Sequence, residues 1–80
     1  MEIREIATAG EKQRIARLVL EALPDWFGIP EAREEYIGKS ASRPFFAAFD
    51  GERAIGFLCL AETGKDTAEL YVMGVLKEYH

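Results

Sequence analysis

The amino-acid sequence predicts an α+β domain, a mainly antiparallel β-sheet with two helices in the order β-α-α-β-β-β. Three patterns carry this prediction. Apolar residues recur at helical spacing over residues 15–23, an Asp-Gly pair at residues 50–51 separates two strand-like runs, and residues 68–76 alternate at strand spacing. Eighty residues suffice for one small hydrophobic core, so residues 1–80 are expected to form a single domain.

The charge balance argues against a nucleic-acid partner. The chain has 14 acidic and 10 basic residues and a formal net charge of -4 at pH 7. Acidic residues exceed basic ones by two both in residues 1–42 (8 against 6) and in residues 43–80 (6 against 4). Since neither half forms a basic arm, we expect no broad electrostatic surface for nucleic acid.

The cysteine and histidine content limits the chemistry further. Cys59 is the single cysteine and His80 the single histidine, which excludes an internal disulfide and a Cys/His zinc site. We therefore expect no metal and a reducing, cytoplasmic setting. The charged N-terminus, Met1 to Glu5, does not resemble a secretory signal, and the longest uncharged stretch, Ala54 to Ala61, is too short to cross a membrane.

Residues 3–6 fit a short first strand, and the segment after them fits a helix. Thr8 followed by Glu11 predicts a capping box at the start of this helix. Pro24 predicts its end, because the residue before a proline avoids the α region. Five apolar residues at helical spacing are expected on its buried face: Ile15, Leu18, Val19, Ala22 and Leu23.

A second, shorter helix is predicted over residues 30–37. Asp25 to Gly28 is expected to be a loop, after which Pro30 suits the first position of a helix. Two early carboxylates suit the positive end of the helix dipole. Gly38 is expected to end this helix, and residues 39–43 are expected to form a polar loop.

Three strands are predicted in the rest of the sequence. Residues 45–49 form an extended apolar run, Asp50-Gly51 indicates a two-residue hairpin turn, and residues 53–62 continue in strand-like composition. A second turn is predicted at residues 63–66, before a strand over residues 68–76. These strands can form an antiparallel meander with the two helices on one face.

Motifs in the second half of the chain carry a family resemblance. Asp50-Gly51 is followed by Ile55-Gly56-Phe57, and the strand Glu69 to Val75 leads into Val75-Leu76-Lys77-Glu78-Tyr79-His80. In this order the motifs resemble the N-terminal half of a GNAT-family N-acetyltransferase, and the likeness covers essentially the whole chain. The resemblance implies the N-terminal part of an acyl-CoA N-acyltransferase fold.

The resemblance also implies an activity, the transfer of an acetyl group from acetyl-CoA, as co-substrate, to a primary amine. In the family, a pyrophosphate-binding loop follows the fourth strand, and His80 matches the first residue of its signature. Because backbone N–H groups of that loop bind the phosphates, we expect the 80-residue chain to be a truncated, inactive fragment. Its last strand would then have an exposed edge, which predicts a homo-oligomer formed by edge pairing.

Five residues receive roles from the resemblance. Glu69 matches the position of the family's general base, which takes a proton from the acceptor ammonium. The backbone N–H of Met73 would face the acetyl carbonyl, and the backbone of Val75 would lie beside the pantetheine arm. Trp26 and Phe27 lie where acceptor-binding residues often occur in the family.

Each of these interpretations has a structural alternative. Glu69 is also typical of a solvated strand residue, and Trp26 and Phe27 are typical of aromatic packing anchors. Cys59 is expected to be a buried structural thiol, and His80 is expected to have no catalytic role. For the whole chain, the alternatives are a small non-enzymatic interaction module that recruits a partner through its last strand, and a structural homodimer.

Overall fold

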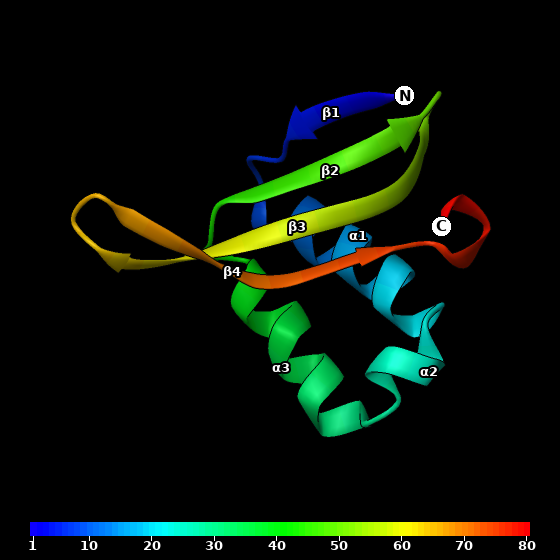
Figure 1. Ribbon diagram of the computed structural model, residues 1–80, viewed down its shortest axis with the longest axis horizontal. Coiled ribbons are helices and arrows are strands. Elements are labelled where there is room, and N and C mark those ends of the chain that lie inside the picture. Colours follow the sequence, from blue (N-terminus) through cyan, green and yellow to red (C-terminus); the bar gives the residue numbers. More distant parts are fainter.

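The computed structural model describes residues 1–80 as a four-stranded sheet with helices on one face (Figure 1). In chain order the elements are β1 (Glu2–Glu5), α1 (Ala9–Glu21), α2 (Pro24–Phe27), α3 (Pro30–Ser40), β2 (Phe45–Asp50), β3 (Arg53–Gly64), β4 (Thr67–Val75) and the 3₁₀ turn η1 (Lys77–Tyr79). The sheet order is β1-β2-β3-β4 and every pairing is antiparallel. This confirms the predicted α+β class and the antiparallel meander, and it leaves β1 and β4 as the sheet edges.

The start of α1 follows the prediction. The Glu11 N–H donates to the Thr8 side-chain oxygen at 3.3 Å, so Thr8 caps the helix. The Glu11 carboxylate accepts from the Arg14 guanidinium instead of returning to the Thr8 backbone. Only one of the two hydrogen bonds of a capping box is therefore formed.

The buried face of α1 and the following turn differs in part from the predicted one. Its buried residues are Ile15, Ala16, Val19, Leu20 and Leu23. Burial was wrongly predicted for Leu18, which is 45% exposed, and for Ala22, which is also exposed. The reason is that α3 lies beside Gln13 and Arg17 of α1, so the buried stripe extends toward that side of the helix.

The number of helices was also wrongly predicted, because the expected loop at residues 25–28 contains a helical turn. Pro24 occupies the start of α2, where its fixed φ suits a helix and its missing N–H costs nothing. The second predicted helix continues beyond Gly38 to Ser40, whose hydroxyl donates to the Tyr36 carbonyl at 2.8 Å. A further short turn, η1, follows β4.

The strand boundaries shift by one or two residues from the predicted ones. The β2–β3 loop consists of Gly51 and Glu52 rather than Asp50 and Gly51. Gly51 has a φ of +63°, whereas the φ of Glu52 is not positive. A two-residue hairpin loop with a positive φ only at its first position favours glycine there. The β3–β4 turn is only Lys65–Asp66, because both strands run further than expected.

A bulge in β4 breaks the predicted alternation. Cys59 pairs with Val72 and Leu60 pairs with Leu70, so Tyr71 is an extra residue without a partner on β3. Val72 lies in the core, and Tyr71 also packs on the helical side, where its ring meets that of Tyr36 edge to face at 5.4 Å. The alternation therefore holds from Val72 onward but not across Tyr71.

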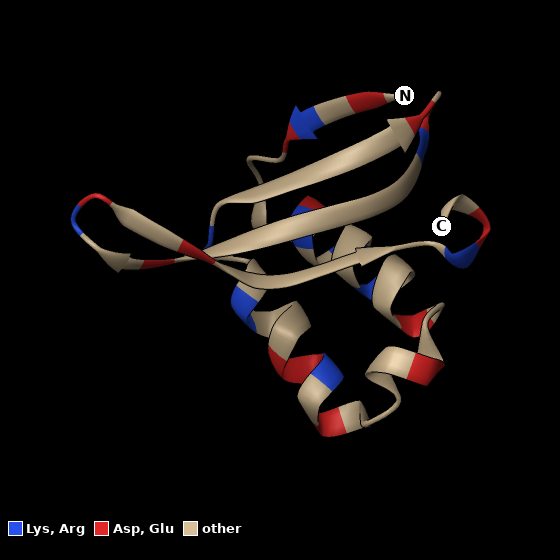
Figure 2. Ribbon diagram, in the orientation of Figure 1, with Lys and Arg blue, Asp and Glu red and all other residues tan.

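The core fills the space between the sheet and the helices, whereas the other face of the sheet has no covering layer in this chain. The rings of Phe45 and Phe57 stack within the core, with their centroids 5.0 Å apart. On the opposite face Ile3 is 66% exposed, Met73 is 49% exposed and Leu58 is partly exposed. Figure 2 shows charged residues on the helices, along β1 and toward the β2–β3 and β3–β4 turns, whereas most of β2 and the middle of β3 carry none. No helix of this chain has both the length and the apolar character needed to cross a membrane.

Gly74 of β4 lies directly against side chains of α1 and of the turn that follows it. A Cβ atom at this position would lie 3.0 Å from Val19 Cγ1 and 3.3 Å from Leu23 Cδ1. We predict that Gly74→Val lowers the free energy of unfolding by about 1–3 kcal/mol, because its side chain overpacks this contact. Urea denaturation followed by circular dichroism measures the change.

Gly38→Ala is the matched control, since a Cβ atom there would meet no atom within 4 Å. Inside a helix this exchange should raise the free energy of unfolding by up to about 1 kcal/mol. A Gly74→Val variant that is as stable as the original chain would show that β4 does not depend on this close approach.

Candidate functional site: a cleft between the last strand and α2

The hydrogen-bonding pattern of β4 leaves half of its backbone groups turned away from β3. The Leu76 N–H donates to the Ile55 carbonyl at 2.8 Å, which makes these two residues a hydrogen-bonded pair. Hydrogen-bonded and non-hydrogen-bonded pairs alternate along an antiparallel ladder. Gly74 lies two residues before Leu76, so Gly74 and its partner Phe57 on β3 are also a hydrogen-bonded pair. Met73 and Val75 fall at the other positions, so their N–H and C=O groups point outward from the sheet edge.

His80 gives independent support for this orientation. Its Nε2 atom lies 2.7 Å from the carbonyl oxygen of Val75. A carbonyl only accepts, so this ring nitrogen donates the hydrogen bond. The Val75 carbonyl is thus on the free side of β4, and the N–H group of Val75 lies on the same side.

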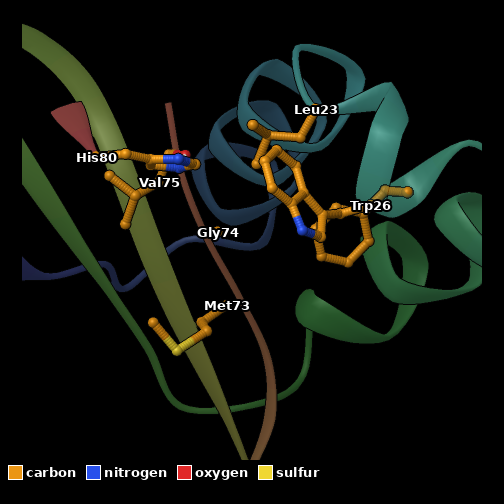
Figure 3. A pocket seen from close by; sticks show the side chains of 7 residues that line it. Leu23, Trp26, Met73, Gly74, Val75 and His80 are labelled. Atoms are coloured by element: carbon orange, nitrogen blue, oxygen red, sulfur yellow. The ribbon is translucent and has the colours of Figure 1, made fainter. Parts of the chain in front are cut away.

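A cleft of about 340 Å³ runs beside this free edge. Figure 3 shows Leu23 and Trp26 on one side of it and Met73, Val75 and His80 on the other. Its wall is almost entirely apolar and consists of Leu23, Trp26, Phe27, Met73, Gly74, Val75 and His80. The outward N–H groups of Met73 and Val75 are therefore backbone donors in a largely apolar wall.

The structure brings together four of the five residues to which a role was assigned. Met73 and Val75 come from β4, and Trp26 and Phe27 come from α2. Glu69 does not line the cleft: it is exposed, makes no ion pair and lies on the far side of the bulge at Tyr71. Met73 is four positions further along the strand, a Cα distance of roughly 13 Å.

Trp26 and Phe27 differ in how far they act as packing anchors. Phe27 is half-buried against the core and meets the Tyr36 ring edge to face at 6.1 Å. Trp26 is 60% exposed, and its main aromatic contact is an edge-to-face one with the His80 ring at 5.5 Å. Phe27 therefore has a structural role as well, whereas Trp26 contributes more to the cleft than to the core.

The sequence analysis matched His80 only to the first residue of the pyrophosphate-binding signature and did not predict that it lines this cleft. Its position depends on η1, which is held to the β2–β3 turn: the Tyr79 hydroxyl donates to Asp50 at 2.7 Å, and Arg53 pairs with Glu78 at 2.6 Å. The hydrogen bond to Asp50 raises the pKa of Tyr79 above its ordinary value. No sequence pattern signals contacts between segments that are so far apart in the chain.

Cys59 and metal binding add nothing to the cleft. Cys59 is fully buried in the core, and this burial raises the pKa of its thiol, so the reactive thiolate form is disfavoured. This agrees with its predicted structural role. The chain brings no three His, Cys, Asp or Glu side chains close enough to hold one metal ion.

A second hollow, of about 210 Å³, lies on the other side of α2, toward α3. Trp26 and Phe27 line both spaces, so α2 is a shared wall between them. The remaining lining residues of this α2–α3 hollow are Ile29, Ala32, Arg33 and Tyr36. It is apolar except for one guanidinium group.

Comparisons of the chain with models of protein families, with curated proteins and with solved structures find no match.

Proposed function

We propose that this chain forms the thioester-holding part of an N-acetyltransferase site, in a GNAT-type acyl-CoA N-acyltransferase fold. The observation that carries the proposal is the pair of outward backbone N–H groups, on Met73 and Val75, in the wall of an apolar cleft. The order of strands and the two longer helices are consistent with the fold that the sequence resemblance implies. The reaction is acetyl transfer from acetyl-CoA to a primary amine.

The outward donors match the needs of this reaction. When the amine nitrogen attacks the thioester carbonyl, negative charge develops on the carbonyl oxygen, and the Met73 N–H is assigned to stabilise it. The C–S bond then breaks, the acetyl group stays on nitrogen, and the proton that the nitrogen loses neutralises the CoA thiolate. The Val75 N–H is assigned to an amide of the pantetheine arm, since His80 occupies only the Val75 carbonyl.

The acceptor is assigned to the same cleft, and the base is assigned to β4 outside it. Trp26 and Phe27 form the wall facing β4 and are proposed to hold the acceptor amine. Glu69 is proposed as the base that removes a proton from the acceptor ammonium. Its distance of roughly 13 Å from Met73 along the strand means that ordered water has to carry the proton between them.

S-acetylpantetheine is the most direct probe of the cleft, because it has the thioester and the pantetheine amides but no diphosphate. We expect it to shift the backbone amide resonances of Met73 and Val75 in a nuclear magnetic resonance titration. Met73→Pro should abolish this binding without unfolding the chain, because it removes an N–H that points outward from an edge strand.

Leu76→Pro is the matched control for this variant. It removes an N–H that is bonded to Ile55, so it should lower the free energy of unfolding by about 1 kcal/mol or more. Unchanged S-acetylpantetheine binding by a folded Met73→Pro variant would contradict the proposed role of the backbone donor.

The role of Glu69 has its own test. In an acetyl-CoA turnover assay of the longer enzyme that the resemblance implies, Glu69→Gln should lower kcat about 100-fold or more, the usual effect of losing a general base. Glu62→Gln serves as control, because Glu62 is also an exposed glutamate near the same end of the sheet. Turnover that Glu69→Gln leaves undiminished would remove Glu69 from the mechanism.

A second candidate function, recruitment of another strand, is favoured by the same free edge and by the uncovered apolar face of the sheet. We propose that a second copy of the chain pairs with β4, since its outward N–H and C=O groups have no strand beside them. Sedimentation equilibrium should show a concentration-dependent dimer. Leu70→Lys, which places a charge on the edge strand, should weaken it.

Leu18→Lys is the control for self-association, because Leu18 is similarly exposed but lies on α1. It should leave the dimer unchanged. A single monomeric species at all concentrations would exclude the pairing of copies through β4.

A further inference from the structure

Arg33 differs from every other arginine in the chain. Four of the six arginines pair with carboxylates: Arg4, Arg14, Arg17 and Arg53. The guanidinium of Arg43 lies over the Tyr71 ring, 4.3 Å from its centroid. Arg33 makes no ion pair and no ring contact. Its Nε atom, like that of Arg43, is buried without a hydrogen-bond partner.

The carboxylates next to Arg33 on α3 are engaged elsewhere. Glu34 accepts two hydrogen bonds from Arg17 of α1, at 2.7 and 2.8 Å. Glu35 pairs with Lys39 one turn further along the helix, at 3.1 Å. Neither Glu34 nor Glu35 is hydrogen-bonded to Arg33.

Arg33 supplies the only charge in the α2–α3 hollow. The other walls are the rings of Trp26, Phe27 and Tyr36 and the side chains of Ile29 and Ala32. A volume of about 210 Å³ is sufficient for a phenyl-sized group, since an apolar cavity of about 150 Å³ holds benzene. A guanidinium binds a carboxylate through two parallel hydrogen bonds, and an unpaired buried donor is costly.

We propose that the α2–α3 hollow binds a carboxylate that carries an apolar side chain, such as an apolar α-amino acid or the C-terminal residue of a peptide. Arg33 holds the carboxylate, and the aromatic rings pack on the side chain. A second part of the inference rests on the proposed function. The hollow and the cleft beside β4 share Trp26 and Phe27 as a wall, so we infer that the acceptor is an amine that also bears a carboxylate. Binding of the acid itself does not depend on acetyl transfer.

Trp26 is the single tryptophan and lines both the hollow and the cleft beside β4, so its fluorescence responds to a ligand in either space. The Arg33 variants identify which space is occupied. We expect L-phenylalanine to change this fluorescence in a saturable manner. L-Phenylalaninamide has the same amine and ring but no carboxylate, and it should bind about tenfold more weakly or worse. Glycyl-phenylalanine, compared with phenylalanine, distinguishes a peptide C-terminus from a free amino acid as the source of the carboxylate.

Variants at Arg33 test the contact. Arg33→Gln should lower the affinity for phenylalanine about tenfold or more and remove the preference over the amide. Arg33→Lys should retain part of the affinity, because it keeps the charge but loses the paired donors. Arg14→Gln is the matched control, since Arg14 is exposed and does not line the hollow, and it should leave the affinity for phenylalanine unchanged. A thermal unfolding curve for each variant shows that the fold is retained.

Three results would overturn the proposal. They are equal binding of phenylalanine and its amide, unchanged phenylalanine affinity in Arg33→Gln, and the absence of saturable binding up to the solubility limit of the ligands. Phenylalanine binding that depends on Arg33, in a protein that fails to bind S-acetylpantetheine, would support the carboxylate site while contradicting the acetyl-transfer proposal. The two proposals can therefore fail separately.

Discussion

The position of β4, at the edge of the sheet and in contact with α1, is the constraint on which the rest of the site depends. Gly74 allows this contact because it has no side chain to collide with Val19 and Leu23. Once Gly74 and Leu76 are bonded to β3, the alternation of an antiparallel ladder turns Met73 and Val75 outward. The donors of the cleft thus follow from backbone geometry and not from the chemistry of any side chain.

The opposite wall of the cleft depends on how α2 and α3 are attached to the sheet. Arg17 of α1 bonds both oxygens of Glu34 on α3, and this contact lowers the pKa of Glu34. Aromatic contacts continue from α2 through α3 to β4, with Tyr36 meeting Phe27 on one side and Tyr71 on the other. The bulge in β4 is what places Tyr71 on the helical side, so the irregularity in the strand supports the aromatic wall.

The parts of the fold that local patterns control could be predicted from the sequence. The Thr8 cap, the turn at Gly51 and the order of the strands each depend on residues that are neighbours in the chain. The exposure of Leu18 could not be predicted, because the buried side of α1 is decided by α3 as well as by the sheet. The bulge at Tyr71 has no local signal either, since it depends on the pairing of two strands.

The candidate site divides in the same way. Met73 and Val75 were assigned roles from a resemblance, and the structure places both beside Trp26 and Phe27. The position of His80 beside the cleft depends on tertiary contacts between η1 and the β2–β3 turn. Arg33 has no ion pair, and this also depends on tertiary contacts, because Glu34 pairs with Arg17 of α1. Glu69 was assigned by position alone, and its exposed place beyond the bulge is not part of the cleft.

Amide hydrogen exchange along β4, measured by nuclear magnetic resonance at a dilution where the chain is monomeric, tests the central claim most directly. An outward N–H that has no hydrogen-bond acceptor exchanges faster than one bonded within the sheet. The geometry predicts protected amides at Val72, Gly74 and Leu76 and fast exchange at Met73 and Val75. Equal protection of all five amides would show that the edge of β4 is already occupied, and the cleft would then have no free backbone donors.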